Sequence, residues 1–171
     1  MKYVIIGNSA AAIGGVEGIR SRDKTGGITL VSDESHFTYS RPLISYLLEG
    51  KTDRERMLYR GRDFYEKNGV TALLGRRAER LEDHAVVLDS GERLPFDRLL
   101  VATGSSPIVP PVPGLTGYYT FMTLDEALRL EAALTKESRV LIVGAGLIGL
   151  KCLEGIAARV GEATVADRAP Q

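Results

Sequence analysis

Apolar and polar positions along the chain predict the same strand–helix–strand unit twice. Residues 2–6 and 28–31 are short apolar runs, as expected of strands buried on both faces. Residues 10–19 between them alternate small and branched apolar side chains, which favours a helix packed closely on a sheet. Residues 139–143, 147–160 and 163–166 repeat this order. Two such units predict an α/β fold with parallel, Rossmann-like sheets.

The segment between the two repeats has a different pattern. A helix is expected within residues 39–48, with Pro42 suited to its first helical position and Gly50 ending it. Gly69 is expected to end a second short helix. A capping box, Thr123 with Glu126, opens a later amphipathic helix. The remaining elements are expected to be a strand at 70–74, a small antiparallel β-meander at 76–81, 85–88 and 92–94, and a buried strand within 96–104.

A proline-rich stretch divides the chain. Residues 105–117 carry four prolines and form the clearest linker in the sequence. The predicted domains are therefore residues 1–112, a Rossmann-like half with the small meander, and residues 113–171, the beginning of a second Rossmann-like unit.

The turn after residues 139–143 carries a dinucleotide-binding pattern. Gly144, Gly146 and Gly149 have the Gly-x-Gly-x-x-Gly spacing, which permits a tight turn, close approach of a pyrophosphate and close helix packing. The following helix would offer free N–H groups to the phosphates. Asp167, 23 residues past Gly144, is placed to accept hydrogen bonds from a ribose 2′-OH. This acid favours NADH over NADPH, a preference that the adjacent Arg168 weakens.

The first turn is a degenerate form of the same pattern. Ser9 and Ala12 stand at the second and third glycine positions, and Asp33, 26 residues past Gly7, has Glu34 beside it as a second candidate ribose acid. For both turns the alternative is an ordinary strand–helix corner in which small residues serve packing alone. The binding residues expected on the first turn are Gly7, Asn8, Ser9, Ala10 and Ala11.

Composition narrows the function classes. The 22 basic and 22 acidic side chains give a formal net charge of zero, so neither nucleic acid nor a membrane is expected as a partner. No apolar run approaches the roughly 20 residues that cross a bilayer, and the N-terminus does not read as a signal peptide. Cys152 is the only cysteine, which excludes an internal disulfide and favours a cytoplasmic location. His36 and His84 lack the spacing of metal ligands, so no metal is expected.

Three segments together resemble the FAD-dependent pyridine nucleotide–disulfide oxidoreductases, which are two-dinucleotide flavoproteins. They are the first turn, the Ala102-Thr103-Gly104 segment within residues 96–107, and the second turn. Their order and spacing match over essentially the whole chain. Residues 32–34 and 39–43 look closest to the branch of NADH-dependent rubredoxin reductases and nitrite reductase flavin subunits.

The resemblance implies FAD on the first turn and NADH on the second. Asp33, or Glu34, would hold the adenosine ribose of FAD, and Arg41 and Pro42 would lie near the flavin. The alternative for Arg41 is a solvated loop arginine. The backbone of Ala102, Thr103 and Gly104 would pass close to FAD, or would form a plain turn at a strand end.

The implied activity is that of an oxidoreductase. NADH would give hydride to FAD, and the electrons would pass to an acceptor protein or partner subunit of the rubredoxin, ferredoxin or nitrite reductase type. Disulfide reductases of the family place a redox cysteine after the flavin loop, whereas residues 40–50 contain none. The acceptor is therefore expected to be external, and Cys152 is expected to be a small buried apolar residue. No catalytic acid or base is expected, because hydride transfer needs only two rings held in contact.

Two departures from the family pattern affect the expected assembly and the nicotinamide site. Many relatives carry a glutamate two residues after the last glycine of the NAD turn, where this chain has Lys151, with Glu154 one helical turn on. Family chains also continue into a segment that completes the FAD fold and usually into a dimerisation domain. The chain resembles their N-terminal part, so unpaired sheet edges and association with a second copy or a complementing chain are expected. The alternatives to an active reductase are a nucleotide-binding fragment without turnover and a subunit that needs another polypeptide.

Overall fold

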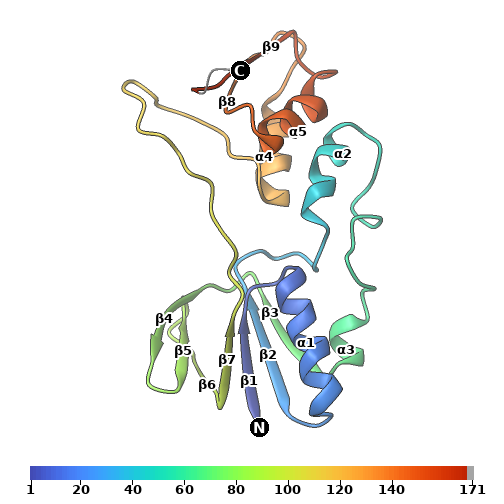
Figure 1. Ribbon diagram of the computed structural model, residues 1–171, viewed down its shortest axis with the longest axis vertical. Helices are drawn as coiled ribbons and strands as arrows, with labels where there is room; N and C mark the ends of the chain where they lie inside the picture. The colour runs from blue at the N-terminus through green and yellow to red at the C-terminus, as the bar shows by residue number, and fades with distance from the viewer. Residues whose placement is uncertain (169–171) are drawn as a thin grey trace. The chain divides into compact units, whose positions relative to one another are not determined.

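The structure is a computed structural model that describes residues 1–168 (Figure 1). The chain forms two compact units, one made of residues 1–39 and 58–105 and the other of residues 40–57 and 106 onward. Residues 40–57 thus belong to the second unit although in sequence they lie between the two stretches of the first unit. The domain boundary expected at residues 112 and 113 stays a prediction. None of the helices in the described part of the chain is long and apolar enough to cross a membrane.

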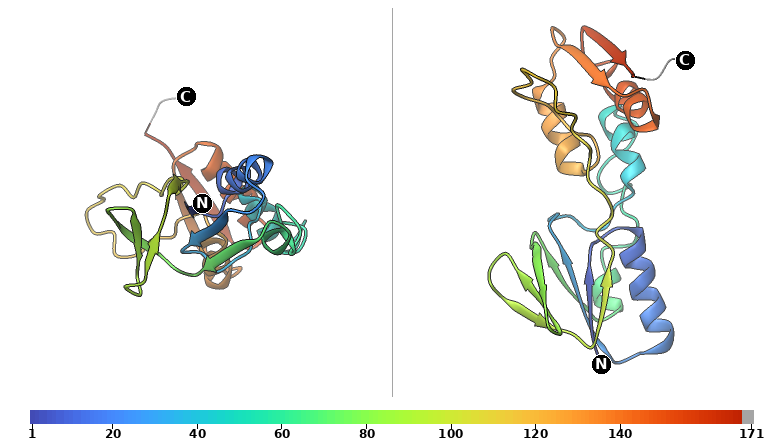
Figure 2. Two further views of the ribbon diagram at one scale, coloured as in Figure 1. Left: turned by 90° about the horizontal axis from the view of Figure 1, so that it is seen from below. Right: turned by 60° about the vertical axis from the view of Figure 1, so that its left-hand side comes forward.

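The first unit is built on a parallel sheet in the order β3-β2-β1-β7. Its strands are β1 (Lys2–Ile6), β2 (Gly27–Ser32), β3 (Val70–Leu74) and β7 (Arg98–Val101). The helices α1 (Ala10–Arg22) and α3 (Phe64–Lys67) lie on one side of the sheet. An antiparallel sheet of β4 (Ala78–Glu82), β5 (Ala85–Leu88) and β6 (Arg93–Pro95) lies on the other side, as both views in Figures 1 and 2 show.

Alternation along β1 explains this three-layer arrangement. Ile5 belongs to the core on the helical side, with Ile13, Val16 and Leu30. Its neighbour Val4 belongs to the opposite core, which includes residues of β5. Successive side chains of a strand point to opposite faces, so a continuous apolar run supplies two cores at once.

One strand differs from the expectation of burial. Leu100 of β7 is 36% exposed and Val101 is 57% exposed. Among the described strands β7 pairs only with β1 and therefore lies at the sheet edge. Its residues are apolar enough for a buried strand, but the sequence pattern does not say which strand takes the edge.

The second unit contains a parallel pair, β8 (Arg139–Val143) and β9 (Glu162–Ala166), connected by α5 (Leu147–Ile156). Helix α4 (Leu124–Ala133) begins with the predicted capping box of Thr123 and Glu126. The helix expected over residues 39–48 is divided into a 3₁₀ turn η1 (Arg41–Leu43) and α2 (Ile44–Leu48), with Pro42 in the first turn of η1. Helix α2 packs against both α4 and α5 (Figures 1 and 2).

The contact between α2 and α5 is a close backbone approach. A Cβ added at Gly155 would lie 2.9 Å from the Ser45 carbonyl oxygen. The Arg159 guanidinium Nε donates to the Leu48 carbonyl over 2.5 Å, next to the C-terminus of α2. This cation at the C-terminal end of a short helix binds a carbonyl of its last turn, where carbonyls lack partners within the helix.

Candidate functional site

The first turn is held by backbone contacts that require glycine at residue 7. Gly7 has φ +120°, and its N–H donates to the Val31 carbonyl over 2.8 Å. A Cβ at Gly7 would lie 2.1 Å from the carbonyl oxygen of Ala102, whose own N–H donates to the Ile6 carbonyl over 2.8 Å. The turn therefore joins the carboxyl ends of three adjacent strands, β2, β1 and β7.

The parallel sheet brings the other predicted residues of the first site to the same edge. Asp33 and Glu34 follow β2, and Ala102, Thr103 and Gly104 follow β7. Ala10 and Ala11 are exposed in the first turn of α1, which contains no acidic residue. Ser9 is the N-cap of this helix but makes no side-chain cap bond. The exposed N–H end of α1 can accept an anionic group at the edge where open α/β sheets bind ligands.

The two neighbouring acids of this site have different surroundings. Tyr39, buried at 9% exposure, donates its hydroxyl to Glu34 Oε2 over 2.5 Å. Asp33 is exposed. The Glu34 carboxylate thus already binds a buried tyrosine, whereas Asp33 is exposed just after β2.

Asn8 connects the first turn to two distant segments. Its Nδ2 donates to the His36 carbonyl over 3.1 Å, and its Oδ1 accepts hydrogen bonds from Thr38 Oγ1 over 2.5 Å and from Tyr65 Oη over 2.8 Å. Thr38 and Tyr65 are buried, with 4% and 8% exposure. The sequence analysis assigned no binding role to Thr38, Tyr39 or Tyr65. No sequence signal separates a tyrosine that donates to a binding turn from one that only packs.

The second turn repeats the backbone geometry of the first. Gly144 has φ +109°, and its N–H donates to the Ala166 carbonyl over 2.7 Å. A Cβ at Gly149 would lie 2.0 Å from the Gly144 carbonyl oxygen, so α5 passes directly against the turn. A Cβ at Gly146 would meet no atom within 4 Å. Gly144 is thus favoured by its positive φ and Gly149 by a close contact, whereas Gly146 borders open space.

Asp167 lies beside this turn, as its spacing predicted. Its Oδ2 accepts a hydrogen bond from the Ala145 N–H over 2.6 Å, and the side chain is exposed. The parallel register that pairs Val143 with Ala166 places the residue after β9 next to the residue after β8. The second turn and its acid therefore form a compact group at the carboxyl ends of β8 and β9.

Arg41, Pro42 and Lys151 belong to the second unit. Arg41 Nη1 lies 3.4 Å from the Met122 carbonyl, and Pro42 is exposed at the start of η1. Lys151 Nζ lies 2.5 Å from Glu154 Oε2 and 4.8 Å from the centre of the Tyr46 ring. The bond to Glu154 raises the pKa of the half-buried Lys151. That Arg41 and Pro42 lie near a flavin stays a prediction.

Cys152 has the surroundings of a structural cysteine. It lies in α5 with 8% exposure, and burial raises its pKa to about 11. A thiol with this pKa carries almost no thiolate near neutral pH, and the thiolate is the reactive form. This agrees with the expected role of Cys152 as a small buried apolar residue.

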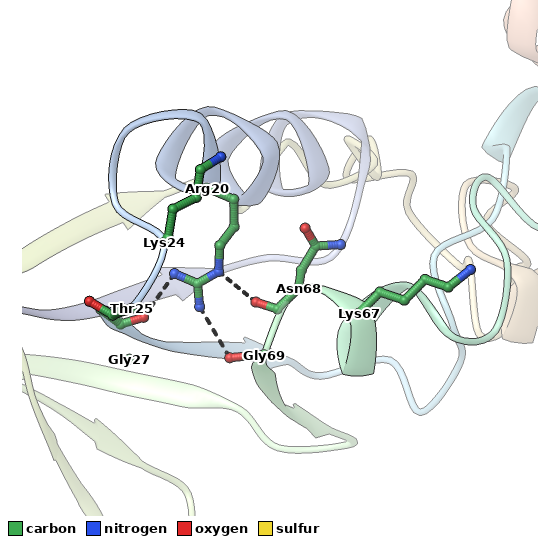
Figure 3. Close-up of a pocket in the computed structure, with 8 residues that line it drawn as sticks. Arg20, Lys24, Thr25, Gly27, Lys67, Asn68 and Gly69 are labelled. Atoms are coloured by element: carbon green, nitrogen blue, oxygen red, sulfur yellow. Dashed lines mark hydrogen bonds between the residues drawn. The ribbon is translucent and has the colours of Figure 1, made fainter.

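A cavity of about 470 Å³ lies at the amino-terminal ends of β2 and β3, away from the first turn (Figure 3). Arg20 dominates it. Its guanidinium donates to the carbonyls of Asn68 over 2.6 Å, Gly26 over 2.8 Å, Asp23 over 3.1 Å and Gly69 over 3.3 Å. Because these donors bind backbone carbonyls, we interpret the cavity as a structural junction between α1, β2 and β3.

The comparisons with known proteins cover most or all of the chain. The family described as "Pyridine nucleotide-disulphide oxidoreductase" matches residues 1–171. The chain is 34% identical to the NADH-dependent phenylglyoxylate dehydrogenase subunit epsilon of Aromatoleum evansii, over 99% of this chain and 41% of that protein. It is 36% identical to the ferredoxin–NAD(+) reductase component of the p-cumate 2,3-dioxygenase system of Pseudomonas putida, over 88% of this chain and 38% of that protein.

Solved structures agree with these relatives. A ferredoxin reductase from Rhodopseudomonas palustris aligns with a TM-score of 0.87 and 26% identity, over 99% of this chain and 43% of that chain. The covalent putidaredoxin reductase–putidaredoxin complex aligns with a TM-score of 0.83 and 28% identity, over 96% of this chain and 41% of that chain. The chain thus spans about two fifths of the length of each of these four proteins. The predicted fold class and family are confirmed.

Proposed function

Because the chain belongs to the pyridine nucleotide-disulphide oxidoreductase family, we propose that its first turn binds FAD and its second turn binds NADH. Hydride would pass from NADH to FAD, and electrons would then pass to an external acceptor such as a small redox protein or partner subunit. One observation carries the proposal. Gly7 and Gly144 both have positive φ, and each donates its N–H to the last or next-to-last residue of the following parallel strand, Val31 or Ala166.

The residues of the first turn fit the adenosine and pyrophosphate part of FAD. Gly7 lets the backbone turn against β7, and the N-terminal end of α1 presents exposed small residues without an acidic side chain. A positive helix end without nearby carboxylates stabilises a phosphate anion. We assign the ribose contact to Asp33 and keep Glu34 as a support of the loop through Tyr39. Arg41 and Pro42 remain the predicted flavin-side residues.

The residues of the second turn fit NADH by the same argument. Gly146 borders open space where a pyrophosphate can approach the backbone, and the first turn of α5 contains no acidic residue. Asp167 carries a carboxylate beside the turn and would accept hydrogen bonds from the ribose hydroxyls. The same carboxylate would repel a 2′-phosphate, so NADH is the proposed donor and NADPH the poorer one.

Hydride transfer between the two cofactors needs side chains only to bind and position them. Bound flavin itself supplies the hydride-accepting ring. The protein residues would bind the two dinucleotides and orient them, which lowers the entropic cost of bringing the rings together. The buried Cys152, with its raised pKa, does not supply a redox thiolate. An external acceptor therefore fits the described residues better than a protein dithiol.

Anaerobic spectroscopy tests this proposal. The purified chain, loaded with FAD and separated from free FAD, is expected to keep a flavin absorption band that NADH bleaches. NADPH at the same concentration is expected to bleach it more slowly. Gly7→Ala should lose FAD because of its clash with Ala102, whereas Gly14→Ala, which meets no atom within 4 Å, should retain it. A parent chain that takes up no FAD would contradict the proposal.

A second candidate is a nucleotide-binding subunit that turns over only with a complementing chain. Exposed apolar strand residues favour it: Leu141 and Val143 on β8 are 63% and 67% exposed. Apolar strand faces of this kind promote association with another chain or another copy. Flavin reduction by NADH that requires addition of the remaining part of a relative, and is absent without it, would support this candidate.

The acceptor class is proposed from the relatives. The similar Pseudomonas putida protein is named as a ferredoxin–NAD(+) reductase component, and an NADH-rubredoxin oxidoreductase of Clostridium acetobutylicum is also similar, at 24% identity. We therefore propose a small iron-containing redox protein as the acceptor. Reduction of added ferredoxin or rubredoxin by NADH, measured in parallel, would distinguish the two. The cytoplasmic location stays a prediction.

A further inference from the structure

The first turn retains one of the three glycines of the pattern, so other contacts must fix its shape. Ser9 and Ala12 occupy the other two glycine positions, and Ala12 is fully buried. Ser9 makes no side-chain cap bond at the start of α1. Asn8, between Gly7 and this N-cap, is the residue whose side chain leaves the turn for the protein interior. Its conformation sets the direction of the N–H groups that follow it.

Both lone pairs of the Asn8 amide oxygen are used within the protein. Thr38 Oγ1 and Tyr65 Oη lie 2.5 Å and 2.8 Å from Asn8 Oδ1, and the two hydroxyl oxygens lie 3.1 Å from each other. Two hydroxyl protons serve these three contacts, so the proton arrangement in which both donate to Asn8 leaves no acceptor site on Oδ1 for a ligand. The amide nitrogen donates to the His36 carbonyl on the same loop as Thr38.

The partners of Asn8 are themselves fixed. Tyr65 belongs to the core cluster of Ile5, Ile13 and Leu30, and its ring stacks on Phe37 with centroids 5.6 Å apart and planes inclined by 19°. Thr38 is 4% exposed. Hydrogen bonds in such buried surroundings are stronger than in water and costly to break, because the freed groups would lack a partner. The turn is thus tied to segments 30 and 57 residues further along the chain.

From these contacts we infer that Asn8, Thr38 and Tyr65 are positioning residues for the dinucleotide at the first turn. They hold the turn's N–H groups in the binding arrangement before a ligand arrives, without touching the ligand through their polar side-chain atoms. Preorganisation of this kind raises affinity because the ordering cost is met during folding. The inference deepens the proposed function, since it rests on the binding of FAD at this turn.

Single hydroxyl deletions test the inference in the full 171-residue chain. Thr38→Val and Tyr65→Phe each remove one donor and keep the side-chain volume, and Thr38→Ser restores a hydroxyl at the same place. Tyr3→Phe is the matched control. It removes a hydroxyl that donates to Asp23 over 3.1 Å in the same unit, from a residue at the beginning of β1.

Two readouts are needed, namely hydrogen exchange of the amides of residues 8–12 without ligand, and the dissociation constant for FAD. Thr38→Val and Tyr65→Phe are expected to speed this exchange and to weaken FAD binding about two- to tenfold, the range of one hydrogen bond. Thr38→Ser and Tyr3→Phe are expected to match the parent in both readouts.

The outcomes separate this inference from the proposed function. Exchange at residues 8–12 that is unchanged in Thr38→Val and Tyr65→Phe overturns the inference, whatever happens to FAD affinity. Faster exchange with unchanged FAD affinity also overturns it, since the cluster would then stabilise the fold alone. If the parent binds no FAD, the proposed function fails, and faster exchange in these two variants but not in Tyr3→Phe still supports the locking of the turn.

Discussion

Gly149 is the position at which the second turn tolerates no side chain, so Gly149→Ala gives a sharp test of the turn's packing. The added Cβ would lie 2.0 Å from the Gly144 carbonyl oxygen and 3.3 Å from Ile142 Cγ2. The obstructing oxygen is backbone, and the residue that carries it is held by a 2.7 Å hydrogen bond to Ala166. Overpacking of this kind costs about 1–3 kcal/mol, and we expect the upper part of that range because backbone must move.

The single cysteine supplies an assay that reports on the second unit alone. Cys152 lies in α5 with 8% exposure, so a thiol reagent reaches it when the surrounding structure opens. A loss of about 1–3 kcal/mol raises the open population, and with it the labelling rate, by roughly 5- to 150-fold. Labelling of Gly149→Ala at the parent's rate would refute the argument that this glycine is required by contact.

Gly146→Ala is the matched control because its Cβ would meet no atom within 4 Å. Gly146 has φ −71° and ψ 175°, which alanine also adopts, so only the loss of a favourable N-cap residue is expected, about 0.5–1 kcal/mol. Cys152 labelling should therefore change much less than in Gly149→Ala. The new methyl group would occupy the space assigned to the NADH pyrophosphate, so NADH binding should be lost. Normal NADH binding by Gly146→Ala would contradict the placement of the second site.

Three further predictions concern single side chains. Arg20→Met should lower the unfolding free energy of the first unit by about 1.5–3 kcal/mol in urea, because several carbonyls lose a charged donor, whereas exposed Arg22→Met should not. Burial alone would raise the pKa of Glu126, but hydrogen bonds from Thr120, Thr123 and Met122 outweigh it and leave the pKa lowered. The stability that this carboxylate contributes is therefore present above its ordinary pKa of 4.5 and lost as pH falls through the lowered value. Glu126→Gln should melt at a lower temperature than the parent at neutral pH, and the two melting temperatures should converge in acid. Asp167→Asn should weaken NADH binding and reduce the ratio of NADH affinity to NADPH affinity, measured in parallel titrations.

Much of the fold could be predicted because its signals are local. The apolar runs that became β1 and β2 supply both faces of one sheet, and the capping box of Thr123 and Glu126 fixes the start of α4 within the helix's first turn. The exposure of Val101 could not be predicted in this way. An edge strand and a central strand can share the same apolar composition, and only the order of strands in the sheet separates them.

The candidate site also has features that local sequence signals predict and features that they do not. Spacing after each turn identified acids at residues 33, 34 and 167, because a parallel strand–helix–strand unit has a nearly fixed length. Spacing could not separate Asp33 from Glu34, which differ by one residue. We propose Asp33 because Tyr39 donates its hydroxyl to the Glu34 carboxylate, whereas Asp33 is exposed.

Asn8 shows the same limit more strongly, since its turn was recognisable while its partners were not. Thr38 and Tyr65 contact it from 30 and 57 residues away. A glycine in a tight turn is required by backbone geometry that a short motif encodes. A degenerate turn that replaces glycines must be fixed by side-chain contacts from elsewhere in the fold. The residues that support such a turn can therefore be identified only from the folded structure. For this reason the most informative variants of the first site, at Thr38 and Tyr65, lie outside its sequence motif.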